Sequence, residues 1–429
     1  MSRLTSRLLI SIACIAPLGL PGAASASTWK SCSQVLAKYP NGVARTKAAV
    51  NAVAALGFAK PSVQPKVYGA ARKLDRFKDN TICVTEANKR SALPGLPAPS
   101  TTSTNEPLVS GHPAVSSAMA TAVANLGGTC IVAMKDSKII GEWYTGGRTP
   151  TTKSLAFSSS KPLTAAVIGA ALQLGRLSLD QSIADFIPEL KGTPKAAITI
   201  RHLMTHKSGL KSTNAELNRA LGGTAGTLGA AALALPLTST PGSTWDYETS
   251  GVALQLLVRV VERAVGEKFT SFAEKYVLRP AGMVNSTYKG DDSTTGWSTG
   301  DPWLAGGLDT TCRDLARLGQ LFQAKGQWAG QQIFSPQFAA EAVSIQASDV
   351  VFAMGGLNGT YGLLLNHNWG GIGHGGACGQ LLLTVPSGTT IAMMSSSTLY
   401  TPSMAPQQCA LTRLVQLTQA TVAISTANF

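Results

Sequence analysis

The chain has 429 residues, of which 44% are hydrophobic, 14% are charged and 6% are aromatic. This length predicts two or three folding units, and the apolar content is high enough to fill their cores, which excludes a disordered protein. The formal net charge is +14, and the charge is distributed unevenly along the chain.

The first 26 residues have the pattern of a secretory signal peptide. Arg3 and Arg7 precede an apolar run that begins at Leu8, and Ala24-Ser-Ala26 supplies small residues for cleavage. We therefore expect residues 1–26 to be removed and the protein to be extracellular, either free or attached to the cell wall. A membrane anchor is disfavoured because the apolar run is shorter than the roughly 20 residues that cross a bilayer. No later apolar stretch is long enough either, so no stable membrane span is expected.

The segment from residue 27 to residue 91 carries most of the positive charge. It contains 12 Lys or Arg residues and 3 Asp or Glu residues. Loss of Arg3 and Arg7 with the signal lowers the net charge by two, from +14 to +12, so this segment holds three quarters of the excess. Adhesion to an anionic cell-wall polymer is one explanation, and a solvated basic face explains the charge equally well. A nucleic-acid partner is not expected, because the protein is predicted to be secreted and has no base-stacking motif.

Six cysteines remain after removal of the signal peptide, at positions 32, 83, 130, 312, 378 and 409. An even number of cysteines in a secreted chain predicts disulfides. Cys32 and Cys83 are the only two in the first segment, and we expect them to pair. The sequence leaves the pairing of the other four open.

Residues 27–84 resemble the excalibur domain, a small extracellular module of bacterial surface proteins. The resemblance rests on Cys32, Lys38-Tyr-Pro-Asn-Gly-Val-Ala44 and Leu74-Asp-Arg-Phe-Lys-Asp-Asn-Thr-Ile-Cys83. That family has a calcium loop of the form D-x-D-x-D-G-x-x-C-E, in which alternating carboxylates supply oxygen ligands. Asp75 and Asp79 fit this loop, whereas the other positions are occupied by Phe77, Asn80 and Val84. We expect no useful calcium affinity, and tight binding in calorimetry of the module would contradict this.

Residues 85–107 are rich in Pro, Ser and Thr, which predicts a linker without a packed core. Helix and strand signals then alternate without interruption over residues 108–429, a length typical of one large enzyme domain. Within it, residues 130–134 and 139–144 flank a polar turn and predict a hairpin. Residues 380–385 and 389–394 predict two further strands around Pro386-Ser-Gly388, followed by a long helix that ends near Ala423.

Two helices are predicted between these strands. Apolar residues continue at helical spacing after Phe157-Ser-Ser-Ser-Lys-Pro-Leu163 until Gly175, with Pro162 in the first turn. A second helix is predicted over residues 252–265 and ends at Gly266. Strands at both ends of the domain with helices between them predict an α+β fold, in which one antiparallel sheet is covered by helices.

Ser158 and Lys161 lie one helical turn apart at the start of the first of these helices. A lysine desolvated in a pocket can lose its proton and act as the base that activates a serine nucleophile. The pattern Ser-x-x-Lys also begins at Ser27, Ser208 and Ser286. Only Ser158 opens an apolar helix, so the context favours it over the other three.

Three motifs in this order carry a resemblance: Ser158-x-x-Lys161, Trp245-Asp-Tyr-Glu-Thr-Ser-Gly251 and Gly373-His-Gly-Gly376. Arg201-His-Leu-Met-Thr-His-Lys-Ser-Gly-Leu210 supports them. The domain resembles the serine hydrolase family that includes class C beta-lactamases, D-alanyl-D-alanine carboxypeptidases, related esterases and 6-aminohexanoate-dimer hydrolases. The resemblance implies a beta-lactamase/transpeptidase-like fold, with an antiparallel sheet flanked by helices and a helical subdomain.

The resemblance also implies roles for single residues. Ser158 is the expected nucleophile, Lys161 its base, and Tyr247 the group that moves protons between nucleophile and leaving group. His374 and Gly376 match the third motif, which faces the substrate. The backbone amides of Ser158 and Ala377 are the expected oxyanion hole. Tyr247 as a core tyrosine and His374 as a loop histidine with satisfied hydrogen bonds remain as alternatives.

The chain departs from the family pattern at two substrate-binding positions. Thr249 stands where the family commonly has Asn, and it cannot offer both an amide donor and an amide acceptor. His374 replaces the lysine that binds a beta-lactam carboxylate, so we expect weak or no beta-lactamase activity. Cys378 lies close to this motif and is expected to pair with Cys409 or Cys312, with a free thiol as the alternative.

No cofactor and no metal are expected. His202 and His206 could share a helix face, but no third ligand is evident near them. The sequence thus predicts a secreted serine hydrolase that cleaves an ester or amide of a small molecule or peptide through an acyl-enzyme on Ser158. The alternatives are a D-alanyl-D-alanine carboxypeptidase or penicillin-binding protein at the cell wall, and a non-catalytic wall-binding protein.

Overall fold

The computed structural model describes residues 31–48, 50, 60–71, 81–82, 117, 120–121, 127–212, 228–247, 251–288, 301–351, 358–368 and 370–395. The chain divides into two compact units, Met1–Val53 with Ala59–Ala87 and Ala54–Phe58 with Asn88–Phe429. The predicted signal peptide and the predicted linker over residues 85–107 lie outside the described residues. Within the described ranges, no helix is both long and apolar enough to cross a bilayer.

The described residues of the smaller unit form short helices and short strands. They are α1 (Cys32–Lys38), β1 (Val43–Ala44), β2 (Ser62–Val63), α3 (Pro65–Ala71) and β3 (Thr81–Ile82). Strand β1 is central and pairs parallel with β2 and antiparallel with β3. Val35, Val43 and Tyr68 are buried in its small core. Cys83, the side chain of Cys32 and the calcium-loop positions lie outside the described residues, so the disulfide and the loss of calcium binding remain predictions.

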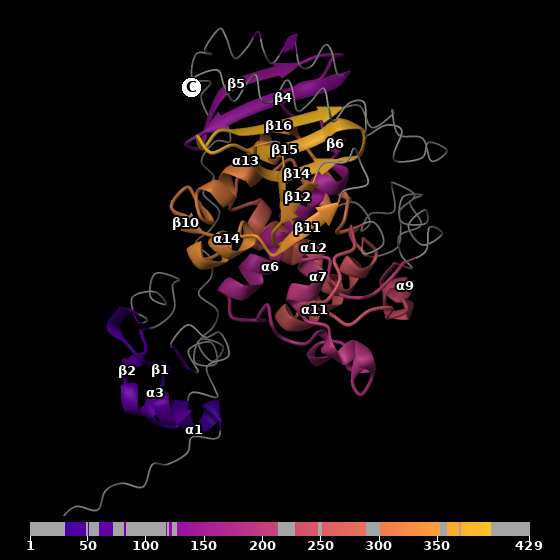
Figure 1. Cartoon of the computed structure of the whole chain (residues 1–429). Coiled ribbons are helices and arrows are strands. Elements are labelled where there is room, and N and C mark those ends of the chain that lie inside the picture. Colours follow the sequence, from indigo (N-terminus) through magenta and orange to yellow (C-terminus); the bar gives the residue numbers. More distant parts are fainter. Residues whose placement is uncertain are drawn as a thin grey trace, which may run out of the picture. The chain divides into compact units, whose positions relative to one another are not determined.

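The larger unit is built on an antiparallel sheet of eight strands in the order β11-β12-β13-β14-β15-β16-β4-β5 (Figure 1). In chain order the strands are β4 (Gly128–Lys135), β5 (Lys138–Tyr144), β11 (Ala347–Val351), β12 (Asn358–Tyr361), β13 (Asn366–Asn368), β14 (Gly371–Gly376), β15 (Gln380–Thr384) and β16 (Thr390–Ser395). Strand β16 pairs with β4, so the strands near the two ends of the domain form one sheet. The predicted sheet is confirmed.

Both predicted hairpins are present in this sheet. Strands β4 and β5 pair antiparallel, and Asp136 and Ser137 between them have φ values of 49° and 62°. Two consecutive residues with positive φ match the right-handed twist of a tight hairpin. Strands β15 and β16 pair around a turn in which Gly388 has a φ of 84°. The long helix predicted to follow, up to Ala423, lies outside the described residues.

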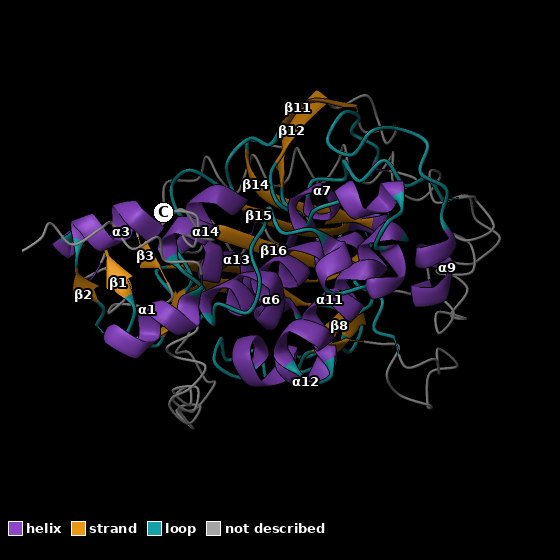
Figure 2. Ribbon diagram, turned by 90° about the horizontal axis from the view of Figure 1, so that it is seen from below, coloured by secondary structure: helices purple, strands orange, loops and turns teal. Residues whose placement is uncertain are grey.

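The main helices of the larger unit lie against this sheet and against one another (Figures 1 and 2). They are α6 (Lys161–Gln173), α11 (Leu256–Val265) and α13 (Cys312–Gln323), with the shorter α7 (Ile200–Met204), α9 (Leu228–Ala234), α12 (Phe269–Ala273) and α14 (Pro336–Ala342). Twelve of the thirteen residues of α6 are buried, which identifies it as the central helix. Helix α11 ends at Gly266, which is left-handed with a φ of 78°, as the sequence predicted.

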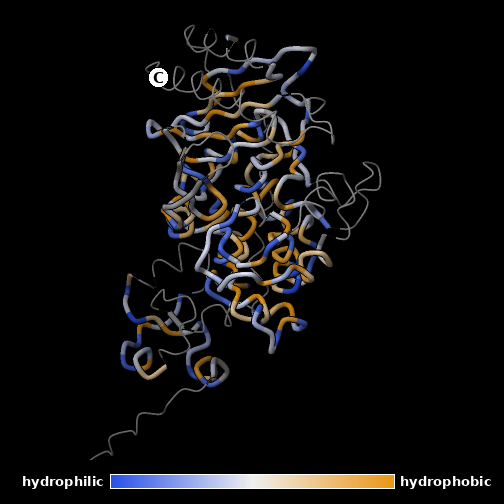
Figure 3. Tube along the Cα trace, turned by 45° about the vertical axis from the view of Figure 1, so that its right-hand side comes forward, coloured by the Kyte–Doolittle hydropathy of each residue, from blue (hydrophilic) through white to orange (hydrophobic). Residues whose placement is uncertain are grey.

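Shorter elements complete the unit. A second sheet has the order β6-β8-β7, with β6 (Ser154–Leu155), β7 (Thr287–Tyr288) and β8 (Leu308–Thr310), and β9 (Gln327–Trp328) pairs with β10 (Gln331–Gln332). The 3₁₀ turns are η2 (Phe157–Ser160), η3 (Ile183–Asp185), η4 (Pro188–Leu190), η5 (Pro194–Ala197), η7 (Ala253–Gln255) and η9 (Ala377–Gly379), and η8 (Glu274–Leu278) is a π-helical turn. Apolar residues concentrate in the inner strands and the helices packed on them (Figure 3).

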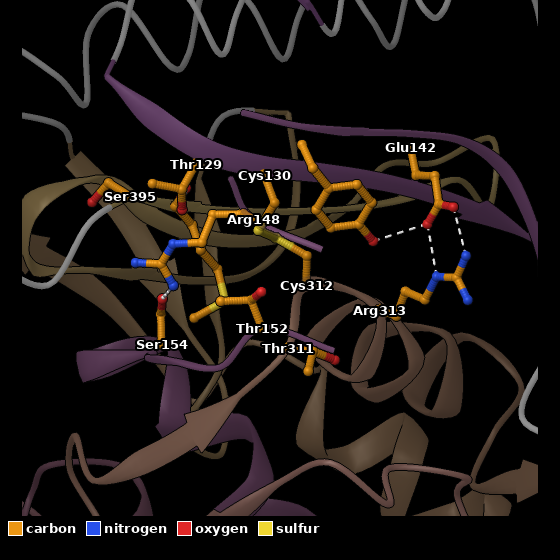
Figure 4. Close-up of a disulfide and its surroundings, with 12 residues drawn as sticks. Thr129, Cys130, Glu142, Arg148, Thr152, Ser154, Thr311, Cys312, Arg313 and Ser395 are labelled. Atoms are coloured by element: carbon orange, nitrogen blue, oxygen red, sulfur yellow. Dashed lines mark hydrogen bonds and ion pairs between the residues drawn. A yellow bond between two sulfur atoms is a disulfide. The ribbon is translucent and has the colours of Figure 1, made fainter. Parts of the chain in front are cut away.

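Helix α13 is fixed to the sheet by a disulfide between Cys130 of β4 and Cys312, its first residue (Figure 4). Nearby, Glu142 accepts hydrogen bonds of 2.7 and 2.5 Å from Arg313 and one of 2.9 Å from the Tyr144 hydroxyl. The alternative in which Cys378 pairs with Cys312 is therefore wrong, because Cys312 lies beneath β4, with its Cα 6.3 Å from that of Cys130. Cys409 and the side chain of Cys378 lie outside the described residues.

Reduction of this disulfide is expected to lower the free energy of unfolding by about 2–5 kcal/mol. The reason is that the bond links residues 182 positions apart and so restricts the unfolded chain strongly. The measurement is the urea midpoint of the oxidised protein with and without a reductant. The double variant Cys130→Ser, Cys312→Ser serves as control. Its urea midpoint should be low, and because it lacks this disulfide the reductant has no bond between these positions to break. Equal midpoints for oxidised protein and double variant would contradict the expectation.

Candidate active site

The predicted nucleophile, Ser158, lies in η2, which connects β6 to α6. Its neighbours anchor this turn: Ser159 Oγ donates to the His374 carbonyl at 2.8 Å, and Ser160 Oγ accepts from the Leu308 amide at 3.0 Å. Both neighbours are buried, whereas Ser158 is partly exposed. Phe157 has a φ of 46°, a left-handed conformation that is rare for such a bulky residue. The turn is therefore strained and is held by hydrogen bonds to β14 and β8, and it leaves the Ser158 side chain accessible.

Lys161 is buried directly behind Ser158, with only 3% of its surface exposed. Its Nζ lies 3.0 Å from Ser158 Oγ, 3.1 Å from Tyr247 Oη and 3.0 Å from the Ala305 carbonyl oxygen. A charged ammonium group has three N–H donors, one for each of these oxygens. Burial lowers the pKa of Lys161 to about 7. Loss of one proton thus leaves a lone pair that can accept the Ser158 hydroxyl proton.

Tyr247 is held by its ring as well as by its hydroxyl. The ring lies between two others, stacked on Trp245 at a centroid distance of 5.9 Å and on His374 at 5.8 Å. The ring is only partly buried, and Lys161 Nζ lies 4.8 Å from its centroid. The structure thus brings Ser158, Lys161 and Tyr247 together around one nitrogen atom, although Tyr247 is 86 residues from Lys161 in the sequence.

His374 lies in β14 and not in a loop, and it is 1% exposed. Its Nδ1 is 2.7 Å from the Gly375 carbonyl oxygen. Because a carbonyl can only accept, Nδ1 carries the proton and Nε2 offers a lone pair. Burial first, and then the charge of Lys161, hold the pKa of His374 well below its usual range. At neutral pH this position therefore holds an uncharged imidazole.

Gly376 allows β14 to approach η2, the turn that contains Ser158. A Cβ atom at this position would lie 2.4 Å from the Ala156 carbonyl oxygen and 3.2 Å from Ser159 Oγ. Ala377 follows directly and begins η9. The oxyanion hole formed by the amides of Ser158 and Ala377 stays a prediction. Thr249 lies outside the described residues.

Two residues that the sequence analysis did not place in the site lie behind Tyr247. Tyr361 Oη is 3.0 Å from His206 Nε2 and 3.3 Å from His374 Nε2. All three side chains are buried, at 1% exposure or less. His206 belongs to the Arg201–Leu210 motif, which supported the family resemblance without a role in the site, and Tyr361 is 155 residues away from His206. No local sequence pattern could have predicted this contact.

Within the described ranges, no group of three His, Cys, Asp or Glu side chains could hold a metal ion.

Comparison with known proteins identifies relatives of the larger unit. The family model described as Beta-lactamase matches residues 115–416. The 6-aminohexanoate-dimer hydrolase of Paenarthrobacter ureafaciens is 23% identical over 214 residues, which are 47% of this chain and 53% of that protein. Esterase EstB of Burkholderia gladioli is 30% identical over 148 residues, 29% of this chain and 36% of that protein. The chain thus matches about half, or less, of the length of these curated relatives.

Solved structures show the same fold. A penicillin-binding protein homolog from Caulobacter crescentus has a TM-score of 0.56 and 18% identity, with 73% of this chain and 97% of that chain covered. At this identity the likeness shows the fold alone. The resemblance inferred from the three motifs is confirmed, because the family match covers more than half of the chain. The chain belongs to the beta-lactamase family.

Proposed function

We propose that this protein hydrolyses an ester or amide of a small molecule or peptide through an acyl-enzyme on Ser158. The observation that carries the proposal is the position of Lys161 Nζ, which is within hydrogen-bond distance of both Ser158 Oγ and Tyr247 Oη. A buried amine with a pKa of about 7 is half unprotonated at neutral pH and can act as a general base. A non-catalytic binding protein would not require a buried amine, whose desolvation destabilises the folded state.

The proton path follows from these contacts. Neutral Lys161 takes the proton of Ser158 as its oxygen attacks the substrate carbonyl, and the new ammonium group donates to Tyr247 Oη. Tyr247 gives its own proton to the leaving oxygen or nitrogen as the bond to the acyl carbon breaks, and Lys161 replaces that proton. Water then attacks the acyl-enzyme along the reverse path, which restores Ser158. No cofactor is needed for this sequence of steps.

The proposal favours esters and amides over beta-lactams. His374 occupies the place where beta-lactam recognition uses a lysine, and its pKa is held well below the usual range, so it supplies no fixed cation. Two relatives are named as an esterase and as a 6-aminohexanoate-dimer hydrolase, which also supports this substrate class.

A substrate panel tests this proposal. The panel contains p-nitrophenyl butyrate, the corresponding p-nitroanilide, penicillin G and a peptide that ends in D-alanyl-D-alanine, each measured with wild type and with Ser158→Ala. We expect turnover of the ester or the anilide that the variant lacks, and little or no turnover of penicillin. Release of D-alanine as the fastest reaction would favour the carboxypeptidase instead. Equal rates for wild type and variant would contradict an acyl-enzyme on Ser158.

We further propose that the protein is secreted and that its basic N-terminal segment adheres to anionic wall polymers. The support is the charge of residues 27–91 and the signal-like start of the chain. The test is sedimentation of the mature chain with purified cell walls, beside a chain that lacks residues 27–91, at low and high salt. Pelleting that needs the segment and is lost at high salt is expected. Pelleting that is the same for both chains would mean that the charge is only a solvated face.

A further inference from the structure

Three buried side chains form a hydrogen-bonded row behind the proposed proton donor Tyr247. The row, which we call the buried relay, consists of His206, Tyr361 and His374. His206 is in the segment after α7, Tyr361 is the last residue of β12 and His374 is in β14. The Tyr361 hydroxyl oxygen lies 3.0 Å from His206 Nε2 and 3.3 Å from His374 Nε2. The relay borders the active site because Tyr247 Oη lies 3.5 Å from the same His374 Nε2.

Hydrogen-bond chemistry gives the relay a direction. His374 Nδ1 is protonated because it faces the Gly375 carbonyl, so Nε2 has one lone pair to offer. The hydroxyl oxygens of Tyr361 and Tyr247 lie 3.3 and 3.5 Å from that nitrogen, so both are within hydrogen-bond distance of the lone pair. When Tyr361 donates its only proton there, its oxygen must accept from His206, so His206 carries its proton on Nε2. In this arrangement the direction is His206 to Tyr361 to His374.

The relay is uncharged at neutral pH. Burial holds the pKa values of His206 and His374 well below the usual range, with the charge of Lys161 acting in the same direction. Burial also raises the pKa of Tyr361 well above its usual range. The tautomers deduced from the contacts therefore persist over the pH range in which Lys161 titrates.

We propose that Tyr361 is a positioning residue for acyl transfer: its hydroxyl, oriented by His206, occupies the His374 lone pair and so leaves the Tyr247 proton for the leaving group. This inference rests on the proposed function, because it assigns a role in the same reaction. Without the Tyr361 hydroxyl, Tyr247 becomes the available donor to His374 Nε2, 3.5 Å away. The Tyr247 proton is then directed away from the substrate, and departure of a basic leaving group is slowed.

The test is Tyr361→Phe, which keeps the ring and removes the hydroxyl. Two substrates with the same acyl group separate the steps: ethyl butyrate, whose alkoxide must be protonated as it leaves, and p-nitrophenyl butyrate, whose phenolate leaves without a proton. We expect kcat/KM to fall about 10-fold or more for ethyl butyrate. For p-nitrophenyl butyrate, and for labelling by a fluorophosphonate, the rates should stay within about 2-fold of wild type.

His206 provides a matched pair of variants. His206→Gln keeps an N–H donor near the position of Nε2, and His206→Leu removes it, while both place a side chain at the same backbone φ of 54°. The leucine variant should reproduce the leaving-group effect of Tyr361→Phe, and the glutamine variant should restore most of the ethyl butyrate activity. Melting curves establish that the variants compared are folded.

The outcomes separate the two claims. A uniform loss across both esters and the fluorophosphonate, or no loss for any of them, would overturn the role of Tyr361 while leaving the acyl-enzyme intact. If wild type neither turns over the esters nor takes up the label, the proposed function fails and this inference fails with it.

Discussion

The variant Lys161→Met is expected to lose about 10²- to 10⁴-fold in kcat/KM for p-nitrophenyl butyrate. Methionine fills a similar volume but has no amine. The base that lies 3.0 Å from Ser158 Oγ in the wild type is therefore absent from the variant. Lys211→Met is the matched control, because Lys211 also follows a serine, Ser208, by three positions and is exposed. It should retain wild-type activity. Comparable losses in both variants would contradict the role of Lys161.

The pH dependence of the wild type provides a second measurement of the same base. Burial lowers the pKa of Lys161 from 10.5 to about 7, and only the neutral amine can accept a proton. The kcat/KM value should therefore rise with pH and level off above a midpoint near 7. His206 and His374 do not produce this midpoint, because their pKa values lie well below the usual range. A midpoint near 10, or a profile that persists in Lys161→Met, would contradict the assignment.

The second large effect is expected for Tyr247→Phe, which should lower kcat/KM for ethyl butyrate by about 10²- to 10⁴-fold. The phenylalanine keeps the ring stack with Trp245 and His374 but lacks the hydroxyl, 3.1 Å from Lys161 Nζ, that carries a proton to the leaving group. Tyr144→Phe is the control, since its hydroxyl bonds Glu142 in β5 at 2.9 Å. Equal activity of Tyr247→Phe and wild type would mean that Tyr247 is only a packing residue.

The elements that the sequence predicted well are those with local signals. The hairpin of β4 and β5 has alternating and apolar runs on either side of Asp136 and Ser137, and α11 has an apolar face that stops at Gly266. Such signals span a few residues, so they do not depend on distant parts of the chain.

The candidate active site was predictable to the extent that its residues lie in recognisable motifs. Ser158, Lys161, Tyr247 and His374 could be named because each stands in a short family pattern. The contact of Tyr361 with His206 could not be predicted, because it joins positions 155 residues apart and the motif that contains His206 indicates no partner for it.

The disulfide illustrates the same limit. Six cysteines allow 15 pairings, and the sequence left the partner of Cys312 open. The structure pairs it with Cys130 because α13 begins beneath β4, a contact between segments 182 residues apart. The packing of a helix on a particular strand depends on the whole fold, so spacing along the chain does not determine it.

The measurement that tests the acyl-enzyme most directly is the intact mass of the protein after incubation with a fluorophosphonate and, separately, with a penicillin. Peptide mapping then locates the label, with Ser158→Ala as the test variant and Ser208→Ala as the matched Ser-x-x-Lys control. We predict one fluorophosphonate adduct on the peptide that contains Ser158, absent from Ser158→Ala and retained in Ser208→Ala, and no penicilloyl adduct. A penicilloyl adduct on Ser158 would replace the esterase or amidase assignment by a penicillin-recognising one. Absence of any adduct on wild type, or a label that persists in Ser158→Ala, would contradict nucleophilic catalysis by Ser158.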